Sequence, residues 1–254
     1  MNKFTILGSG SSLGSPWITN FRGKLKNDIK NKRSRCCAHI QYGGISVLID
    51  TSPDIKNQVL ENKIRNLDAV IYTHEHADQT SGIFELRPFF WKNKKTIPVY
   101  GSKRTINALL SKYNFCFYPK HGYVPIMKAH IVNHNFNIKK KKNIFKIKAF
   151  EVIHGMIKAN GFLFNKVAYL SDCNKIPKKS LKNLYNLNFL ILDCLRKNKH
   201  PSHFNYDEAL ELAKLVKPKK TILTNLHTDL DYFYLKKNLP KNIIPAYDGL
   251  SFKF

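Results

Sequence analysis

Short runs of β-branched and aromatic residues recur along the whole chain, and they limit its possible folds more than any other feature. They lie at residues 4–7, 38–42, 45–49, 69–72, 145–152, 167–170, 189–192 and 221–223. Runs of this length and composition predict strands, and a run without polar residues, such as 69–72, predicts a strand buried on both faces. Gly43 and Gly44 separate two of the runs, which predicts a hairpin with a two-residue turn.

Three segments between these runs have the pattern of helices, at residues 54–62, 103–113 and 206–216. The third is the best defined, because Asn205 can cap its first turn and Glu208 completes a capping box. Pro218 ends it, since proline cannot continue a helix. No linker rich in Pro, Gly or Ser divides the chain. We therefore expect residues 1–254 to form a single α/β domain of two sheets with helices outside.

The chain is strongly basic. Its 254 residues include 43 Lys and Arg but 17 Asp and Glu, a formal net charge of +26. Such a charge attracts anions, which favours a phosphate-bearing substrate or RNA as partner. The basic residues are nevertheless spread over many segments, and aromatic residues do not alternate with them as a stacking platform requires. A compositional bias of the whole surface is the alternative explanation, and we favour it.

Composition also narrows the class of protein. Apolar residues make up 43% of the chain, which is typical of a globular protein. No apolar run approaches the ~20 residues that span a bilayer, and the first residues contain no signal-peptide core. We therefore expect a cytoplasmic protein with no membrane partner. Its five cysteines, an odd number at scattered positions, argue against a disulfide framework.

The segment at residues 72–79, directly after a predicted buried strand, carries the clearest chemical signal. His74 and His76 are one residue apart and can turn both imidazoles toward one metal ion. Asp78 follows at the same spacing and can reach a second, neighbouring ion. Imidazole and carboxylate ligands together suit zinc, manganese or iron. Taken alone, the motif also fits a polar loop with two solvated histidines.

Three further predicted strands are followed, within a few residues, by a side chain that can bind a metal. These residues are His154, Asp172 and His227. His154 precedes Gly155, which permits a close approach of the backbone to a ligand. Any one of them, taken singly, fits an ordinary core or surface residue. Four strand ends with such side chains in one chain instead predict a metal centre built on loops.

Together these segments resemble the metallo-β-lactamase superfamily, whose pattern is HxHxDH followed by a distant His, Asp and His. The resemblance covers nearly the whole chain and includes LGSGSS at 7–12, LIDTSPD at 48–54, GIFELRP at 82–88, LTNLHTDLDY at 223–232 and AYDG at 246–249. It is nearest to the PhnP-like cyclic phosphodiesterases and the related ribonuclease Z enzymes. The resemblance implies a four-layer αββα sandwich of the α/β class.

The resemblance also implies two metal sites. The implied ligands are His74, His76 and His154 for the first ion, Asp78 and His227 for the second, and Asp172 as a bridge between the two. Gln79 stands at the sixth position of the HxHxDH motif, which is usually a histidine. A neutral amide oxygen is a weaker metal ligand than an imidazole. We therefore expect two divalent ions, zinc or manganese, with Gln79 as a weak ligand and the second ion held loosely.

Two residues are expected to act in catalysis. His203 precedes the predicted helix at 206–216, whose N-terminus favours an anion. The resemblance implies that this histidine contacts the phosphate and protonates the leaving oxygen. Asp78, the second expected catalytic residue, or Asp172 can orient the attacking hydroxide. Metal-bound imidazoles are usually oriented by a further hydrogen bond. From their positions in the motifs, we expect three carboxylates to supply such bonds: Asp50, Asp229 and Asp248.

We therefore expect a metal-dependent phosphodiesterase that hydrolyses a small phosphodiester, cyclic substrates included, by a metal-activated hydroxide. Three alternatives stay open. The chain could be an endoribonuclease of the ribonuclease Z type that processes tRNA 3′ ends, or an acyl or thioester hydrolase on the same fold. It could also be a basic nucleic-acid-binding protein whose hydrolytic site has decayed. The resemblance further implies a homodimer.

Overall fold

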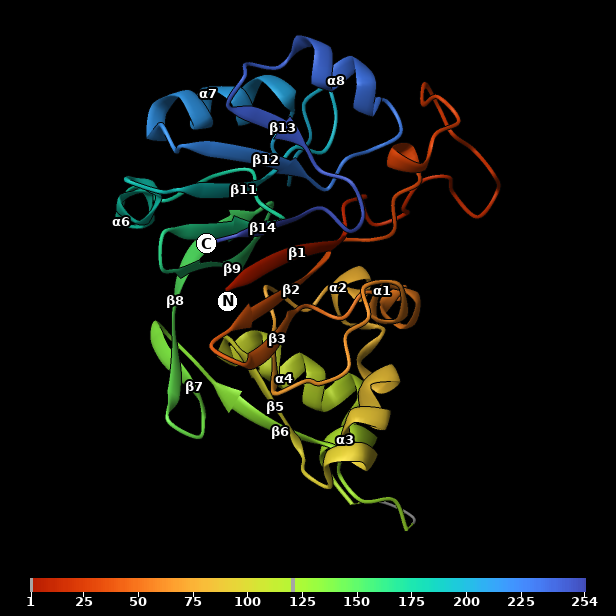
Figure 1. The fold of residues 1–254 in the computed structure, drawn as a ribbon, viewed down its shortest axis with the longest axis vertical. Coiled ribbons are helices and arrows are strands. Elements are labelled where there is room, and N and C mark those ends of the chain that lie inside the picture. Colours follow the sequence, from red (N-terminus) through yellow and green to blue (C-terminus); the bar gives the residue numbers. More distant parts are fainter. Residues whose placement is uncertain (1, 120–121) are drawn as a thin grey trace.

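Two β-sheets form the centre of the molecule, and helices cover their outer faces (Figure 1). The computed structural model describes residues 2–119 and 122–254. The seven-stranded first sheet has the order β14-β1-β2-β3-β4-β5-β6. Its strands are β1 (Lys3–Gly8), β2 (Cys37–Tyr42), β3 (Ile45–Ile49), β4 (Ala69–Ile71), β5 (Ile97–Gly101), β6 (Met127–Ile131) and β14 (Ser251–Lys253).

The second sheet also has seven strands, in the order β13-β12-β11-β10-β9-β8-β7. They are β7 (Asn135–Lys140), β8 (Asn143–His154), β9 (Ile157–Phe164), β10 (Val167–Leu170), β11 (Phe189–Asp193), β12 (Lys220–Thr224) and β13 (Ile243–Pro245). Strands β7 to β10 pair antiparallel, whereas β10 to β13 pair parallel. Because parallel strands end at the same edge, the segments that follow β10, β11 and β12 meet there.

The helices are α1 (Ile55–Glu61), α2 (Ala77–Thr80), α3 (Arg87–Asn93), α4 (Lys103–Lys112), α5 (Asn114–Phe117), α6 (Lys178–Leu181), α7 (Tyr206–Val216) and α8 (Tyr232–Asn238). The longest helices are α4, with 10 residues, and α7, with 11. Single 3₁₀ turns are η1 (Ile29–Asn31), η2 (Ile83–Leu86) and η3 (Lys182–Leu184). This arrangement confirms the αββα sandwich that the sequence resemblance implied.

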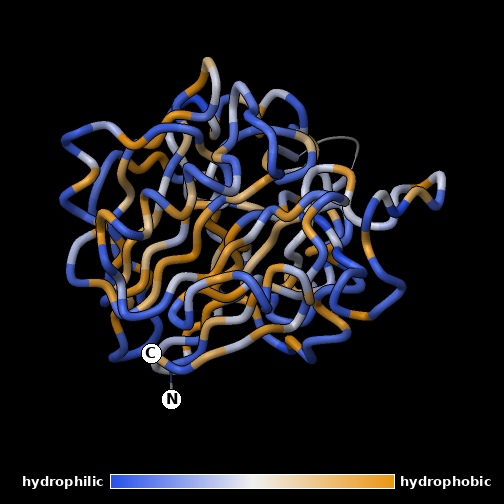
Figure 2. The backbone as a smooth tube through the Cα atoms, turned by 90° about the horizontal axis from the view of Figure 1, so that it is seen from above, coloured by the Kyte–Doolittle hydropathy of each residue, from blue (hydrophilic) through white to orange (hydrophobic). Residues whose placement is uncertain are grey.

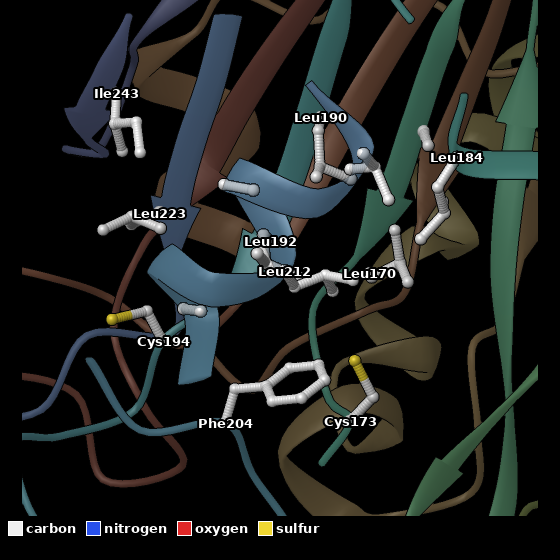
Figure 3. Packing of buried hydrophobic residues seen from close by; sticks show 14 of the residues in the cluster. Leu170, Cys173, Leu184, Leu190, Leu192, Cys194, Phe204, Leu212, Leu223 and Ile243 are labelled. Atoms are coloured by element: carbon white, nitrogen blue, oxygen red, sulfur yellow. The ribbon is translucent and has the colours of Figure 1, made fainter. Parts of the chain in front are cut away.

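Alternate residues of the central strands face different hydrophobic cores, which explains why these strands are apolar throughout. In β11, Ile191 points into the core between the two sheets, whereas Leu190 and Leu192 face the outer core beneath α7. Figure 3 shows both leucines in one buried cluster with Leu212 of that helix, and Leu192 lies beside it. Each fully buried leucine contributes roughly 1.5–3 kcal/mol. Hydrophobic segments accordingly run through the middle of the molecule and hydrophilic ones surround it (Figure 2).

The structure confirms the best-defined predictions and changes others. β2 and β3 form the expected hairpin, and α7 has the expected bounds and capping box. β8 is longer than the predicted strand at 145–152, because its pairing with β9 continues to His154. Of the described residues, none belongs to a helix long and apolar enough to cross a membrane.

Candidate metal centre

The histidine loop begins where β4 ends, and a buried carboxylate fixes its conformation. Asp50 follows β3 and adopts a positive φ of 64°. It accepts two hydrogen bonds from Thr73, one from the backbone N–H (2.8 Å) and one from the hydroxyl (2.9 Å). The same hydroxyl lies 3.0 Å from Nδ1 of His74. Asp50 therefore acts on His74 through Thr73, which leaves Nε2 of that imidazole directed away from this bond.

Three imidazoles meet at the end of this loop. His74 and His76 come from the loop, and His154 from the last position of β8. One ring nitrogen of each histidine lies within 4.8 Å of the other two. His154 Nδ1 is 2.7 Å from the Ser202 carbonyl oxygen. Since a carbonyl only accepts, Nδ1 carries the proton and Nε2 keeps its lone pair, 3.2 Å from Nδ1 of His76.

These three histidines fit a divalent cation. Burial lowers the pKa of His74 to about 3, and burial with the nearby charge of His154 lowers the pKa of His76. Both rings are therefore neutral near pH 7 and offer lone pairs. Within the described residues, Nε2 of His74 is buried without a hydrogen-bond partner. A buried polar nitrogen left unpaired is costly, and a cation with imidazole ligands would satisfy it.

The carboxylate side of the centre has a different chemistry. Gln79 Nε2 donates hydrogen bonds to Asp78 Oδ2 (3.1 Å) and to Asp172 Oδ2 (3.3 Å). Burial and the charge of Asp172 raise the pKa of Asp78 to about 6. Burial acts against ionisation of Asp172 too, yet the neighbouring imidazoles, His74 first, hold its pKa below the ordinary value. The amide nitrogen of Gln79 thus lies between the two carboxylates, where its amide oxygen was expected as a ligand.

His203 lies opposite the three imidazoles and pairs with a residue that the sequence did not single out. Its Nδ1 is 2.7 Å from Oδ2 of Asp193, the last residue of β11. Burial alone would lower the pKa of His203, but the charge and hydrogen bond of Asp193, with the charges of Asp172 and Asp78, raise it to about 9. His203 is therefore protonated near pH 7, and its ring centroid is 4.6 Å from that of His154.

Asn225 joins the charged groups on this side. It follows β12 with a positive φ of 62°. Its Nδ2 donates to Asp193 Oδ1 (3.1 Å) and lies 3.3 Å from Asp172 Oδ1. Asp172, Asp193 and Asn225 thus stand at the ends of three neighbouring parallel strands. The available signal in the sequence was a polar residue directly after each apolar run, the same signal that identified Asp172.

His227 lies on the remaining wall. Its Nδ1 is 3.3 Å from Asp229 Oδ1, the contact expected of that carboxylate. The buried guanidinium of Arg33 donates to the backbone oxygens of His227 (3.2 Å) and Leu230 (2.7 Å), which fixes the segment. Asp78 and His227 line the same cavity as the other residues, but neither belongs to the two close groups of ligand atoms, His74–His76–His154 and His154–Asp172–His203.

One expected contact is wrong. Among the described residues, Asp248 forms no hydrogen bond with a histidine; its carboxylate accepts hydrogen bonds from the backbone N–H and hydroxyl of Ser9 and of Ser34. It ties the loops after β1 to the C-terminal end of the chain. Its motif position suggested an imidazole partner, but the partners are supplied by a loop that only the tertiary structure brings near.

The cavity above these residues has a volume of about 410 Å³ and a polar wall. It is lined by Ser11, Ser12, Leu13, His76, Asp78, His154, Asp172, Leu195, Arg196, His200, Ser202, His203, Asn225 and His227. Leu13 and Leu195 are its apolar members. Such a wall suits a small charged molecule better than an acyl chain.

Comparisons with known proteins agree with this geometry. The family described as the beta-lactamase superfamily domain matches residues 46–225. A diphosphatase of the PhnP family is 32% identical, and its crystal structure matches with a TM-score of 0.90 over 100% of this chain and 97% of its own. The short form of human tRNase Z has a TM-score of 0.70 at 17% identity, over 99% of this chain and 98% of its own. This second likeness concerns the fold alone.

A curated relative carries a different name. An octanoyltransferase of Porphyromonas gingivalis is 29% identical over 252 residues, which is 96% of this chain and 50% of the relative. The chain therefore spans half the length of that relative.

Proposed function

Because the chain belongs to the metallo-β-lactamase superfamily of metal-dependent hydrolases, we propose that it is a phosphodiesterase acting on a small phosphodiester, cyclic substrates included. One juxtaposition carries the proposal: ring nitrogens of three imidazoles come together, and the ring of the protonated His203 lies 4.6 Å from one of them, His154. Phosphodiester hydrolysis needs both a cation near the phosphoryl oxygens and a proton for the leaving oxygen. The 32% identical protein of the PhnP family is named a diphosphatase, which supports hydrolysis at phosphorus.

His74, His76 and His154 would hold a divalent ion, zinc or manganese, through their free ring nitrogens. When bound, such an ion lowers the pKa of water toward ~7 and offsets negative charge on a phosphoryl oxygen. Asp78 and Asp172, with His227, would supply ligands for a second ion, provided that the Gln79 amide gives up its bonds to the two carboxylates.

The remaining residues move protons and position the substrate. His203 would donate its proton to the leaving oxygen, a role typically worth ~10²–10⁴-fold in rate. Asp193 holds the imidazolium in place through its 2.7 Å bond. Asp78 would orient the attacking water by accepting a hydrogen bond from it. The side chain of Arg196, on the same wall, offers positive charge to a phosphate group.

An acyl or thioester substrate is the second candidate, because the curated relative is named an octanoyltransferase. The polar cavity wall favours the phosphodiester over an octanoyl chain. RNA is the third, and its support is the likeness of fold to tRNase Z.

The test is a substrate panel with the protein loaded with zinc and with manganese in turn. The panel contains bis-p-nitrophenyl phosphate, cyclic nucleotides, cyclic ribose phosphates, precursor tRNA and an octanoyl thioester. We expect turnover of at least one small phosphodiester and none of the thioester. Hydrolysis of the thioester without any phosphodiester would overturn the proposal, and cleavage confined to precursor tRNA would replace it with the ribonuclease function.

A further inference from the structure

A second cavity, larger than the catalytic one, lies beside the same β8–β9 hairpin. Its volume is about 680 Å³. His154 of the hairpin lines the catalytic cavity, whereas Met156, two residues on, lines the second cavity. The wall of the second cavity is formed by β8 and β9, by the N-terminus of α4, and by α6 with η3. We call this cavity the basic cleft.

Positive charge dominates the basic cleft. Six of its lining residues are basic: Lys103, Arg104, Lys148, Lys158, Lys179 and Lys182. The single carboxylate among the lining residues is Glu151, which pairs with Lys158 (3.0 Å) and Lys179 (3.5 Å). Arg104 pairs with Glu75, which lies between His74 and His76 in the histidine loop.

Three lysines of the cleft keep their charge uncompensated. Lys103, Lys148 and Lys182 have no carboxylate within ion-pair distance in the part of the chain that the structure describes. Like charges that line one concave wall repel each other, and an anion between them would relieve that repulsion.

The wall of the cleft also contains uncharged hydrogen-bond donors. Nδ2 of Asn160 is buried in the wall and has no acceptor among the described residues. The backbone N–H of the same residue donates to the backbone carbonyl oxygen of Thr73 (2.9 Å), which connects the cleft to the histidine loop. α4 is 10 residues long and begins at the cleft with Ser102 as its cap. The first N–H groups of a helix lack partners within it and attract anions.

We propose that the basic cleft is a second anion site, which binds phosphate groups lying outside the catalytic cavity. This inference rests on the cleft itself and is independent of the proposed phosphodiesterase function. Two sources offer the required chemistry. The phosphates belong either to a distant part of a substrate whose scissile bond lies at the metal centre, or to a separate small polyphosphate.

The test uses two double variants of the full chain loaded with metal. Lys103→Glu/Lys182→Glu reverses two unpaired charges of the cleft, and Lys236→Glu/Lys237→Glu makes the same change on α8, away from the cleft. All four lysines are exposed, so that neither variant disturbs the core. The probes are tripolyphosphate, by calorimetry, and a short fluorescent oligothymidylate, by polarisation.

We expect the cleft variant to weaken binding of at least one probe by about tenfold or more, because two cation–phosphate contacts become repulsive. The α8 variant should change binding less than about twofold. Weakening of the oligonucleotide alone assigns the cleft to an extended substrate, and weakening of tripolyphosphate alone assigns it to a separate ligand. Equal weakening by both variants, or no binding of either probe to the unchanged protein, would overturn the proposal.

Hydrolysis of bis-p-nitrophenyl phosphate separates this proposal from the proposed function. The substrate has a single phosphate, which occupies the catalytic cavity, so the cleft variant should keep its rate within about twofold. If the protein binds the probes through the cleft but hydrolyses no phosphodiester, the anion site is supported and the proposed phosphodiesterase function is contradicted.

Discussion

The two sheets contribute to the candidate metal centre in different ways. The first sheet supplies one continuous segment after β4, which contains His74, His76, Asp78 and Gln79. The second sheet supplies residues from separate strand ends and loops, which are His154, Asp172, Asp193, His203, Asn225 and His227. One half of the centre is therefore local in sequence. The other depends on the strand order of the second sheet, in which β10, β11 and β12 are parallel neighbours and β8 ends at His154.

The difference extends to charge. In the local half, burial lowers the pKa of His74 and His76, so that these rings are neutral and can bind a cation. In the distributed half, Asp193 raises the pKa of His203, so that this ring is a cation and can donate a proton. The same residue type thus has two opposite charge states near pH 7, set by whether a buried carboxylate contacts the ring.

Removal of an imidazole from the local half should have the largest effect. We expect His76→Ala to abolish hydrolysis of all substrates, a loss above about 10⁴-fold. The reason is that the two remaining histidines, His74 and His154, would bind a cation only weakly. Bound metal, measured by mass spectrometry of the purified protein, should fall with activity. His130→Ala, on β6 and outside the centre, is the matched control and should change neither quantity. Full metal content in His76→Ala would contradict the ligand assignment.

Removal of the His203 imidazole, in the distributed half, should leave the metal in place. We expect His203→Ala to lower kcat by about 10²–10⁴-fold with unchanged metal content, since the leaving oxygen loses its proton donor. His200→Ala, in the same cavity wall, should have a smaller effect, because no carboxylate pairs with His200 among the described residues. Unchanged kcat in His203→Ala would show that this histidine has no catalytic role.

A buried histidine outside the candidate centre shows how burial alone changes the pKa of an imidazole. His39 of β2 is 4% exposed, and burial lowers its pKa from 6.5 to about 4. Above pH 6.5 the folded and unfolded chains both carry it neutral. Below this pH the unfolded chain takes up a proton that the folded chain refuses until about pH 4. The free energy of unfolding should therefore fall across this range, by about 3 kcal/mol for this group.

Urea unfolding at pH 7 and at pH 4.5 measures this loss. His39→Gln keeps a partner for the Ser46 hydroxyl, which lies 2.8 Å from His39 Nε2, and removes the titration. The variant should lose markedly less stability than the unchanged protein between the two pH values. An identical loss in both proteins would place the acid sensitivity elsewhere.

The smallest effect is expected where the two halves meet. Gln79→His replaces an amide that bonds Asp78 and Asp172 with an imidazole that can bind a cation. We expect the number of tightly bound ions per chain, measured by calorimetric titration, to rise from one to two, with a change in kcat below about tenfold. Gln79→Asn shortens the amide and keeps its chemistry, and it should leave the number at one. Two tight ions in the unchanged protein would show that the amide does not limit the second site.

By itself, the sequence determined eight of the fourteen strands in the described residues, the capped helix, and the local grouping of candidate ligands after β4. Their signals lie within a few residues of each other: apolar runs for β4 and β10, the Asn205–Glu208 pair for α7, and the spacing of His74, His76 and Asp78. Interactions of this range depend on backbone periodicity and hydrogen bonds that neighbouring residues make whatever the rest of the chain does.

Only the tertiary structure decided which distant residues work together. It paired His203 with Asp193, turned the amide nitrogen of Gln79 toward the two carboxylates, and gave Asp248 to Ser9 and Ser34 rather than to an imidazole. It also gathered the lysines of the basic cleft from five separate elements. The reason is physical: hydrogen bonds and charge pairing act over a few ångströms, and strand order and sheet packing set which groups come that close.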